Sequence, residues 1–268
     1  MSFIFSMLAI AAYTSASLLI LLRLNARRHN LPHRSRQWPI AASFAGLVFH
    51  LIALIYTTFT TNGIDFGIFN IASVVSWTIC TILLLICLKN TLDHLGIVVL
   101  PLAIVTLIFK MLYPESHHLA NHSWELKAHV TLSLLAYSII SLAAVQAMLF
   151  AVQNHHLHNR KPAGFIRVLP PLNKMESLLF QLIVIGFITL TLALGSGFLF
   201  LEDLFAQHVA HKTILSLIAW GGFGILLWGR YRYGWRGKRA TRWTLAGAAL
   251  LMLAYFGSKM VLEWILPH

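Results

Sequence analysis

The sequence predicts an all-α fold, that of a polytopic integral membrane protein with eight transmembrane helices. The first observation is composition: of 268 residues, 58% are hydrophobic and only 10% are charged, whereas an average soluble domain has about 25% charged residues. The second is a mean hydropathy of +0.76. The third is that the apolar residues gather in long runs, and a membrane-spanning helix needs about 20 of them. Soluble, disordered and disulfide-scaffold classes are therefore excluded.

Eight apolar runs reach spanning length. They cover residues 2–22, 39–60, 67–88, 95–113, 129–152, 177–200, 213–229 and 243–265. The first run has no basic residue before it and five soon after it, the reverse of a secretory signal sequence, so it is predicted to be a spanning helix. Pro101 predicts a kink or a break in the fourth helix. Small residues let membrane helices approach closely, and glycines in the last three runs predict such packing: Gly186, Gly195, Gly197, Gly221, Gly222, Gly224, Gly247 and Gly257.

The basic residues predict how the chain is oriented. The formal net charge is +12, and sixteen of the twenty Lys and Arg residues fall in the loops after the first, third, fifth and seventh runs. The positive-inside rule places these loops in the cytoplasm and both termini on the outer, periplasmic side. We interpret the charges as topology signals, so no nucleic-acid partner is expected. No soluble domain or Walker-type loop interrupts the pattern, and residues 1–268 are predicted to form a single transmembrane domain.

The two cysteines exclude two kinds of redox site. Cys80 and Cys87 are seven residues apart in one apolar run, which on a helix separates them by about 10 Å along the axis, too far for a disulfide. The chain contains no Cys-x-x-Cys and no Cys-x-x-Cys-His sequence. A thioredoxin-like site and a covalent haem attachment site within this chain are therefore excluded.

Histidines are the strongest chemical signal, with fourteen of them against eight acids. Six lie near the predicted outer ends of helices: His117, His118, His122, His129, His208 and His211. Neutral imidazole is a common ligand for transition metals and haem iron. We predict that His129 and His211, each at the start of a helix and beside Trp124 or Lys212, clamp one iron axially. The alternative is that these histidines are simply solvated.

His50 lies midway along the second run, where an ionisable side chain is costly and is by default a functional candidate. Three roles are open: a second haem-binding position, a proton relay, or a neutral histidine hydrogen-bonded to a neighbouring helix. A respiratory cytochrome b subunit fits poorly, because His50 has no histidine partner at mid-membrane depth. Trp124 and the other tryptophans near helix ends form either an interfacial belt or an apolar wall for a porphyrin.

The histidine-led segment carries a resemblance to a known family. The stretch His129–Tyr137, preceded by Trp124, resembles a helix of the cytochrome c assembly family, the CcsA/CcmC-like haem-handling membrane proteins. Further stretches resemble that family's later segments in order: Gly186–Gly197, His211–Trp220, Gly234–Ala240 and Tyr255–Gly257. The resemblance covers about residues 40–268 and is to the compact eight-helix, YpjD-like branch of inner-membrane proteins.

This resemblance implies a bacterial inner (plasma) membrane protein that binds haem b non-covalently near its outer face, with His129 as one ligand. The family's second ligand has no match, because that region reads Val261–His268 here, and no Trp lies between Leu201 and Leu215. We infer that His211 replaces it. The implied partners are membrane lipid and apocytochrome c or another membrane or periplasmic protein. The departures leave open a haem-free auxiliary or transport-associated membrane protein that retains the fold.

Overall fold

The computed structural model describes residues 1–28, 35–60, 63–65, 67–89, 93–113, 118–119, 124–158, 169–200 and 210–257. The chain forms two compact units, each built on four helices. One unit is Met1–Asn121 with Asn159–Leu169, and the other is His122–His158 with Pro170–His268. The single transmembrane domain expected from the sequence stays a prediction.

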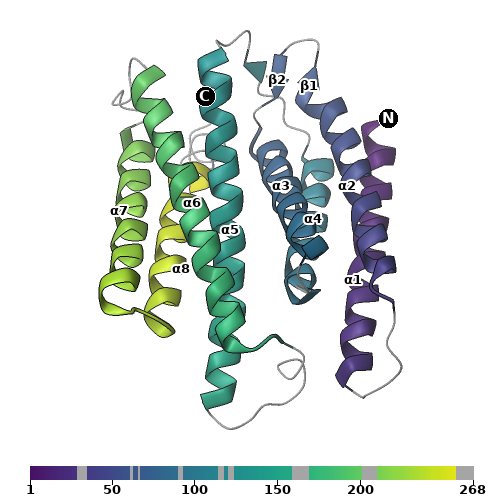
Figure 1. Ribbon diagram of the computed structural model, residues 1–268. Coiled ribbons are helices and arrows are strands. Elements are labelled where there is room, and N and C mark those ends of the chain that lie inside the picture. Colours follow the sequence, from purple (N-terminus) through teal and green to yellow (C-terminus); the bar gives the residue numbers. More distant parts are fainter. Residues whose placement is uncertain are drawn as a thin grey trace. The chain divides into compact units, whose positions relative to one another are not determined.

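The first unit is a ring of four α-helices in which each helix packs against two others. The helices are α1 (Ser2–Arg28), α2 (Gln37–Thr58), α3 (Ile68–Lys89) and α4 (Asp93–Leu112). Helix α1 packs against α2 and α4, and α3 packs against the same two. Successive helices run antiparallel (Figure 1), as short connections between neighbouring helices require.

A small antiparallel sheet caps one end of the first unit; the sequence did not predict it, and it leaves the all-α class in place. Its strands, in the order β1-β2-β3, are β1 (Phe59–Thr60), β2 (Gly63–Asp65) and β3 (His118–Leu119). Phe59 pairs with Ile64, and Ile64 pairs with Leu119. Strands this short show no alternating pattern of their own, so the sequence gives no signal for them.

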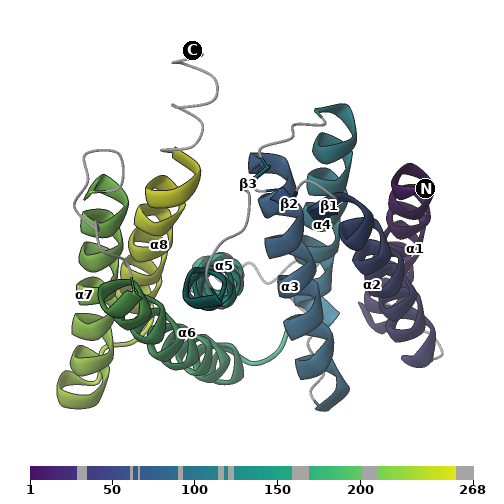
Figure 2. The same ribbon diagram turned by 90° about the horizontal axis from the view of Figure 1, so that it is seen from above.

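The second unit repeats this arrangement. It contains α5 (Trp124–His158), α6 (Leu172–Phe200), α7 (Ala210–Tyr233), α8 (Lys238–Met252) and a π-helical turn, η2 (Leu253–Gly257). Helix α5 packs against α6 and α8, and α7 packs against the same two helices. Seen along the helix axes, α5 lies between α6 and α8 (Figure 2).

Within the described residues, seven helices are long and apolar enough to cross a membrane, and they confirm the first seven predicted runs. They are the helices α1 to α7, with spans from 19 to 34 residues. The eighth run begins later than α8 does, and residues 258–268 of the chain lie outside the described residues. Helix α8 has 15 residues, fewer than a spanning helix needs. An eighth span and the orientation of both termini therefore stay predictions.

Two of the predicted glycine contacts are close. A Cβ at Gly186 would lie 2.8 Å from Ile140 Cγ1, and one at Gly247 would lie 2.6 Å from Phe223 Cζ. Gly195 and Gly221 face open space instead. Of the kink or break predicted at Pro101, the break is wrong, because α4 continues through this residue, and the kink stays a prediction. In an apolar helix with neighbours, the freed backbone groups at a proline can be satisfied locally.

Candidate functional site

One end of the second unit brings together most of the chemistry that the sequence singles out. The starts of α5 and α7 and the end of α6 lie at this end, together with η2 (Figure 1). The antiparallel order of the helices places them so. His129, His211 and Trp124 belong to these helix ends.

His129 is the best-positioned of the predicted ligands. Its half-buried ring places Nδ1 3.0 Å from the carbonyl oxygen of Ala193 and 3.0 Å from Ser196 Oγ, both on α6. The Ser196 hydroxyl donates to the same carbonyl at 2.8 Å. A carbonyl only accepts hydrogen bonds, so Nδ1 carries the proton when it bonds to Ala193.

This geometry fixes the tautomer of a neutral His129. With the proton on Nδ1, the lone pair of the ring lies on Nε2. Within the described part of the chain, no hydrogen bond engages Nε2. Histidines that ligate metals usually donate their other N–H to a carbonyl or a carboxylate in this way.

Aromatic side chains line the same end of the unit. Trp124 is 68% exposed, and its ring centroid lies 5.9 Å from that of Phe200. Tyr137 and Tyr255 meet edge to face with centroids 5.8 Å apart. The Tyr137 hydroxyl donates to the carbonyl of Leu251 at 2.7 Å. This end of the unit thus combines aromatic side chains with a few polar groups whose orientation is fixed by hydrogen bonds, such as the His129 ring and the Tyr137 hydroxyl.

His211 is exposed at the start of α7. Among the described residues, no hydrogen bond, ion pair or ring contact involves it, so nothing joins it to His129. Its neighbour Lys212 lies with Nζ 6.0 Å from the Tyr255 ring centroid. The described ranges contain no group of three metal-ligating side chains. His117, His122 and His208 lie outside the described residues, and only the backbone of His118 is described.

His50 lies in the first unit and is completely buried. Its Nδ1 lies 3.3 Å from the Tyr13 hydroxyl of α1, and its Nε2 lies 2.9 Å from Ser73 Oγ of α3. Both ring nitrogens are therefore occupied, and ligation of a metal would require one of these bonds to break. Gly46, one turn earlier on α2, makes room for the Tyr13 ring, because a Cβ there would lie 2.5 Å from it.

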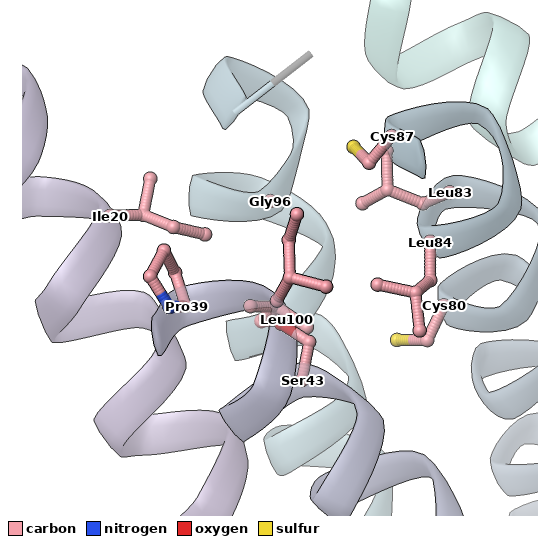
Figure 3. A pocket seen from close by; sticks show the side chains of 10 residues that line it. Ile20, Pro39, Ser43, Cys80, Leu83, Leu84, Cys87, Gly96 and Leu100 are labelled. Atoms are coloured by element: carbon pink, nitrogen blue, oxygen red, sulfur yellow. The ribbon is translucent and has the colours of Figure 1, made fainter. Parts of the chain in front are cut away.

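A mostly apolar pocket in the first unit lies between its four helices. It is lined by Ile20, Pro39, Ile40, Ser43, Cys80, Leu83, Leu84, Cys87, Gly96 and Leu100. Figure 3 shows both cysteine sulfurs directed toward this pocket. Neither cysteine forms a disulfide within the described residues. The Arg36 guanidinium donates to the backbone carbonyl of Cys87 beside the pocket.

Sequence reasoning missed the ionic centre at the opposite end of the second unit. Glu176, 5% exposed, accepts from Arg236 Nε at 2.8 Å and from the Gly237 amide at 3.0 Å. Arg230 Nη1 lies 3.9 Å from Oε1 of the same carboxylate. The hydrogen bond to Glu176 raises the pKa of the Arg236 guanidinium. The available signals were a single acid just before the sixth apolar run and, far away in the sequence, the arginine-rich segment 230–242.

A family model described as cytochrome C assembly protein matches residues 37–266. The inner membrane protein YpjD of Escherichia coli is 33% identical over 266 residues, which cover 98% of this chain and 99% of that protein.

More distant relatives also match. The cytochrome c biogenesis protein CcsA of Welwitschia mirabilis is 27% identical over 217 residues, 69% of this chain and 71% of the relative. Protein HemX of Bacillus subtilis is 29% identical over 142 residues, 51% of each chain. No solved structure matches the chain.

Proposed function

The chain belongs to the cytochrome c assembly protein family, and from this premise we propose that it is a haem-handling protein of cytochrome c biogenesis in the bacterial inner membrane. Seven helices of spanning length support a multi-pass membrane protein. The relative from Escherichia coli is named an inner membrane protein, and other relatives are named for cytochrome c biogenesis. The family therefore indicates a haem-related role.

The proposed site holds haem b non-covalently near the outer face, with His129 as an axial ligand. The observation that carries this proposal is the bond from His129 Nδ1 to the Ala193 carbonyl. It leaves a lone pair on Nε2, and it holds the imidazole ring against α6. The donor chemistry of His129 therefore fits haem iron. His129 would hold the haem, and bound haem would supply an iron centre that takes imidazole nitrogens as ligands.

His211 is the proposed second ligand, and Trp124 a proposed wall for the porphyrin. His211 starts a helix at the same end of the unit as His129, and its exposed ring is not held by any described contact. Trp124 is largely exposed and has an apolar neighbour in Phe200. His50 fits a different role, that of a neutral side chain that ties α1, α2 and α3 together.

Apocytochrome c, or another membrane or periplasmic protein, is the proposed partner. The chain has no Cys-x-x-Cys-His sequence of its own, so a haem held here stays non-covalent and can be passed on. A covalent cytochrome forms only on a polypeptide that offers such cysteines. The direct test of this step is cross-linking of the purified protein to an apocytochrome peptide. The cross-links should form at the outer end of the second unit, where His129 lies.

The deciding experiment measures haem in the detergent-purified protein by absorption spectroscopy and a pyridine haemochrome assay. We expect a low-spin b-type spectrum with about one haem per chain, as a bis-histidine site predicts. His129→Ala and His211→Ala should each lower the haem content. His155→Ala is the matched control, because His155 is an exposed histidine at the other end of α5 and should leave haem content unchanged.

Two results would overturn the proposal. Equal haem content in the wild type and in both variants would show that neither His129 nor His211 is a haem ligand. A wild-type protein without haem, even after expression with added haem, would favour the haem-free auxiliary or transport-associated role. The absence of tryptophan between Leu201 and Leu215 is the observation behind that second role.

A further inference from the structure

The turn between α7 and α8 is held in one conformation by its backbone. Gly234 and Gly237 have φ values of 63° and 58°, which only glycine adopts readily. The Trp235 amide donates to the carbonyl of Gly229 at 3.1 Å. A Cβ at Gly229 would lie 2.5 Å from the Trp235 ring, so the turn and the end of α7 are in close contact.

Glu176 then fixes this turn to α6 and engages two of its cations. The carboxylate binds Arg236 and the Gly237 amide and lies 3.9 Å from Arg230. Arg230 also lies 4.5 Å from the Phe180 ring centroid. Arg230 and Arg236 therefore stabilise the packing of this turn and of α7 against α6.

Four cations in or next to this turn have no acidic partner among the described residues. We name Arg232, Lys238, Arg239 and Arg242 the α8 basic patch; all four are exposed. In the part of the chain that the structure describes, no ion pair involves any of them. Lys238 and Arg242 are four residues apart on α8, and Arg239 and Arg242 are three apart, so they share a helix face.

The cations of the patch are repelled by the helix dipole and by one another, and a bound anion would reduce this repulsion. Helix α8 has no acidic residue in its own first turn, and the carboxylate that reaches its start, Glu176, is already engaged by Arg236 and the Gly237 amide. Three of the patch cations thus lie in the first turns of a helix, where the helix dipole is positive and cations are unfavourable. Like charges at i and i+4 also repel each other.

Exposed aromatic residues mark the depth at which the patch lies. Trp228, Tyr231 and Tyr233 at the end of α7 are 63%, 86% and 69% exposed. In a membrane protein such residues gather at the level of the lipid headgroups. The Arg232 guanidinium lies 6.0 Å from the Tyr233 ring centroid, and that of Arg239 lies 5.6 Å from Trp235. The cations and the interfacial aromatics are therefore interleaved.

We propose that the α8 basic patch binds the phosphate headgroup of an anionic phospholipid. The patch offers uncompensated positive charge, and a spanning helix with headgroup-level aromatics leads directly into it. Clusters of four to eight Lys and Arg residues next to a membrane helix suit anionic lipids. An acidic soluble protein or a nucleic acid would not need the exposed aromatic residues.

The test is native mass spectrometry of the detergent-purified full-length chain, titrated with phosphatidylglycerol or phosphatidylcholine. We expect retention of phosphatidylglycerol and not of phosphatidylcholine. The double variant Arg239→Gln with Arg242→Gln should bind phosphatidylglycerol about tenfold to thirtyfold more weakly, from the loss of two cations near a headgroup. The control is Arg27→Gln with Arg28→Gln, which removes the same charge at the end of α1 and should bind like the wild type.

Three outcomes would overturn the proposal. Equal weakening in the control variant would mean that net charge alone attracts the lipid. Unchanged binding of phosphatidylglycerol by the α8 double variant would show that the α8 basic patch is not the lipid site. Displacement of phosphatidylglycerol by an equal concentration of inorganic phosphate would show a site for free phosphate rather than for lipid. None of these outcomes depends on haem, so the proposed function is tested separately.

Discussion

The buried histidine of the first unit allows a prediction in which two physical effects can be separated. His50 is 0% exposed and joins Tyr13 on α1 to Ser73 on α3. His50→Ala removes the ring and both hydrogen bonds. His50→Phe removes the hydrogen bonds but keeps an aromatic ring, a somewhat larger one, in the same place. Comparing the two variants therefore separates packing from hydrogen bonding.

The expected magnitudes differ. A hydrogen bond between membrane helices contributes about 0.6 kcal/mol on average, so the two bonds of His50 together contribute about 1 kcal/mol. Deleting a buried ring costs about 3 to 5 kcal/mol, mainly through the cavity that it leaves. His50→Ala should therefore lower the free energy of unfolding by about 4 kcal/mol, and His50→Phe by about 1 to 2 kcal/mol.

The assay is unfolding of the detergent-solubilised protein followed by circular dichroism, with haem content measured on the same samples. We expect haem content to stay at the wild-type level in both variants, because both His50 ring nitrogens are already hydrogen-bonded. Equal destabilisation by the two substitutions would refute the reasoning, since it would mean that the hydrogen bonds dominate. Loss of haem in both would identify His50 as a ligand.

Three further substitutions test other contacts. Ser196→Ala removes one partner of His129 Nδ1 and should weaken haem binding about fivefold in a Soret titration, a loss of about 1 kcal/mol; unchanged affinity would count against a positioning role. Gly247→Leu places a side chain against the buried Phe223 ring and should destabilise the second unit by about 1 to 3 kcal/mol, whereas a Tm at or above the wild-type value would contradict the close packing. Glu176→Ala removes the carboxylate that binds two arginines, and its Tm should fall and become less sensitive to salt; a salt response like that of the wild type would argue against the ion pair.

The helices could be predicted from the sequence because the signal for each helix lies in consecutive residues. A run of apolar residues of spanning length identifies a helix without any information about its neighbours, and seven of the eight predicted runs match spans in the structure. The sheet at the end of the first unit depends on pairing between strands far apart in sequence, such as Ile64 with Leu119. Such pairing leaves no mark within a strand of two or three residues.

The site could be predicted by residue type but not by geometry. His129 stands out as a histidine at a helix start, but its partners Ala193 and Ser196 follow 64 and 67 residues later. A carbonyl oxygen is present at every residue, so no sequence pattern reveals which one orients the ring. The same holds for Glu176, whose partner Arg236 is 60 residues away.

Helix α6 links the two chemically distinct ends of the second unit. Its first turns carry Glu176, a buried carboxylate that binds the turn before α8. Its last turns carry Ala193 and Ser196, which hold His129. The end with Glu176 is fixed by charged hydrogen bonds, whereas the end with His129 has exposed side chains at Trp124 and in α7. Among the described residues, the ion pairs of α6 therefore lie at its first turns, whereas its last turns orient a histidine through neutral hydrogen bonds.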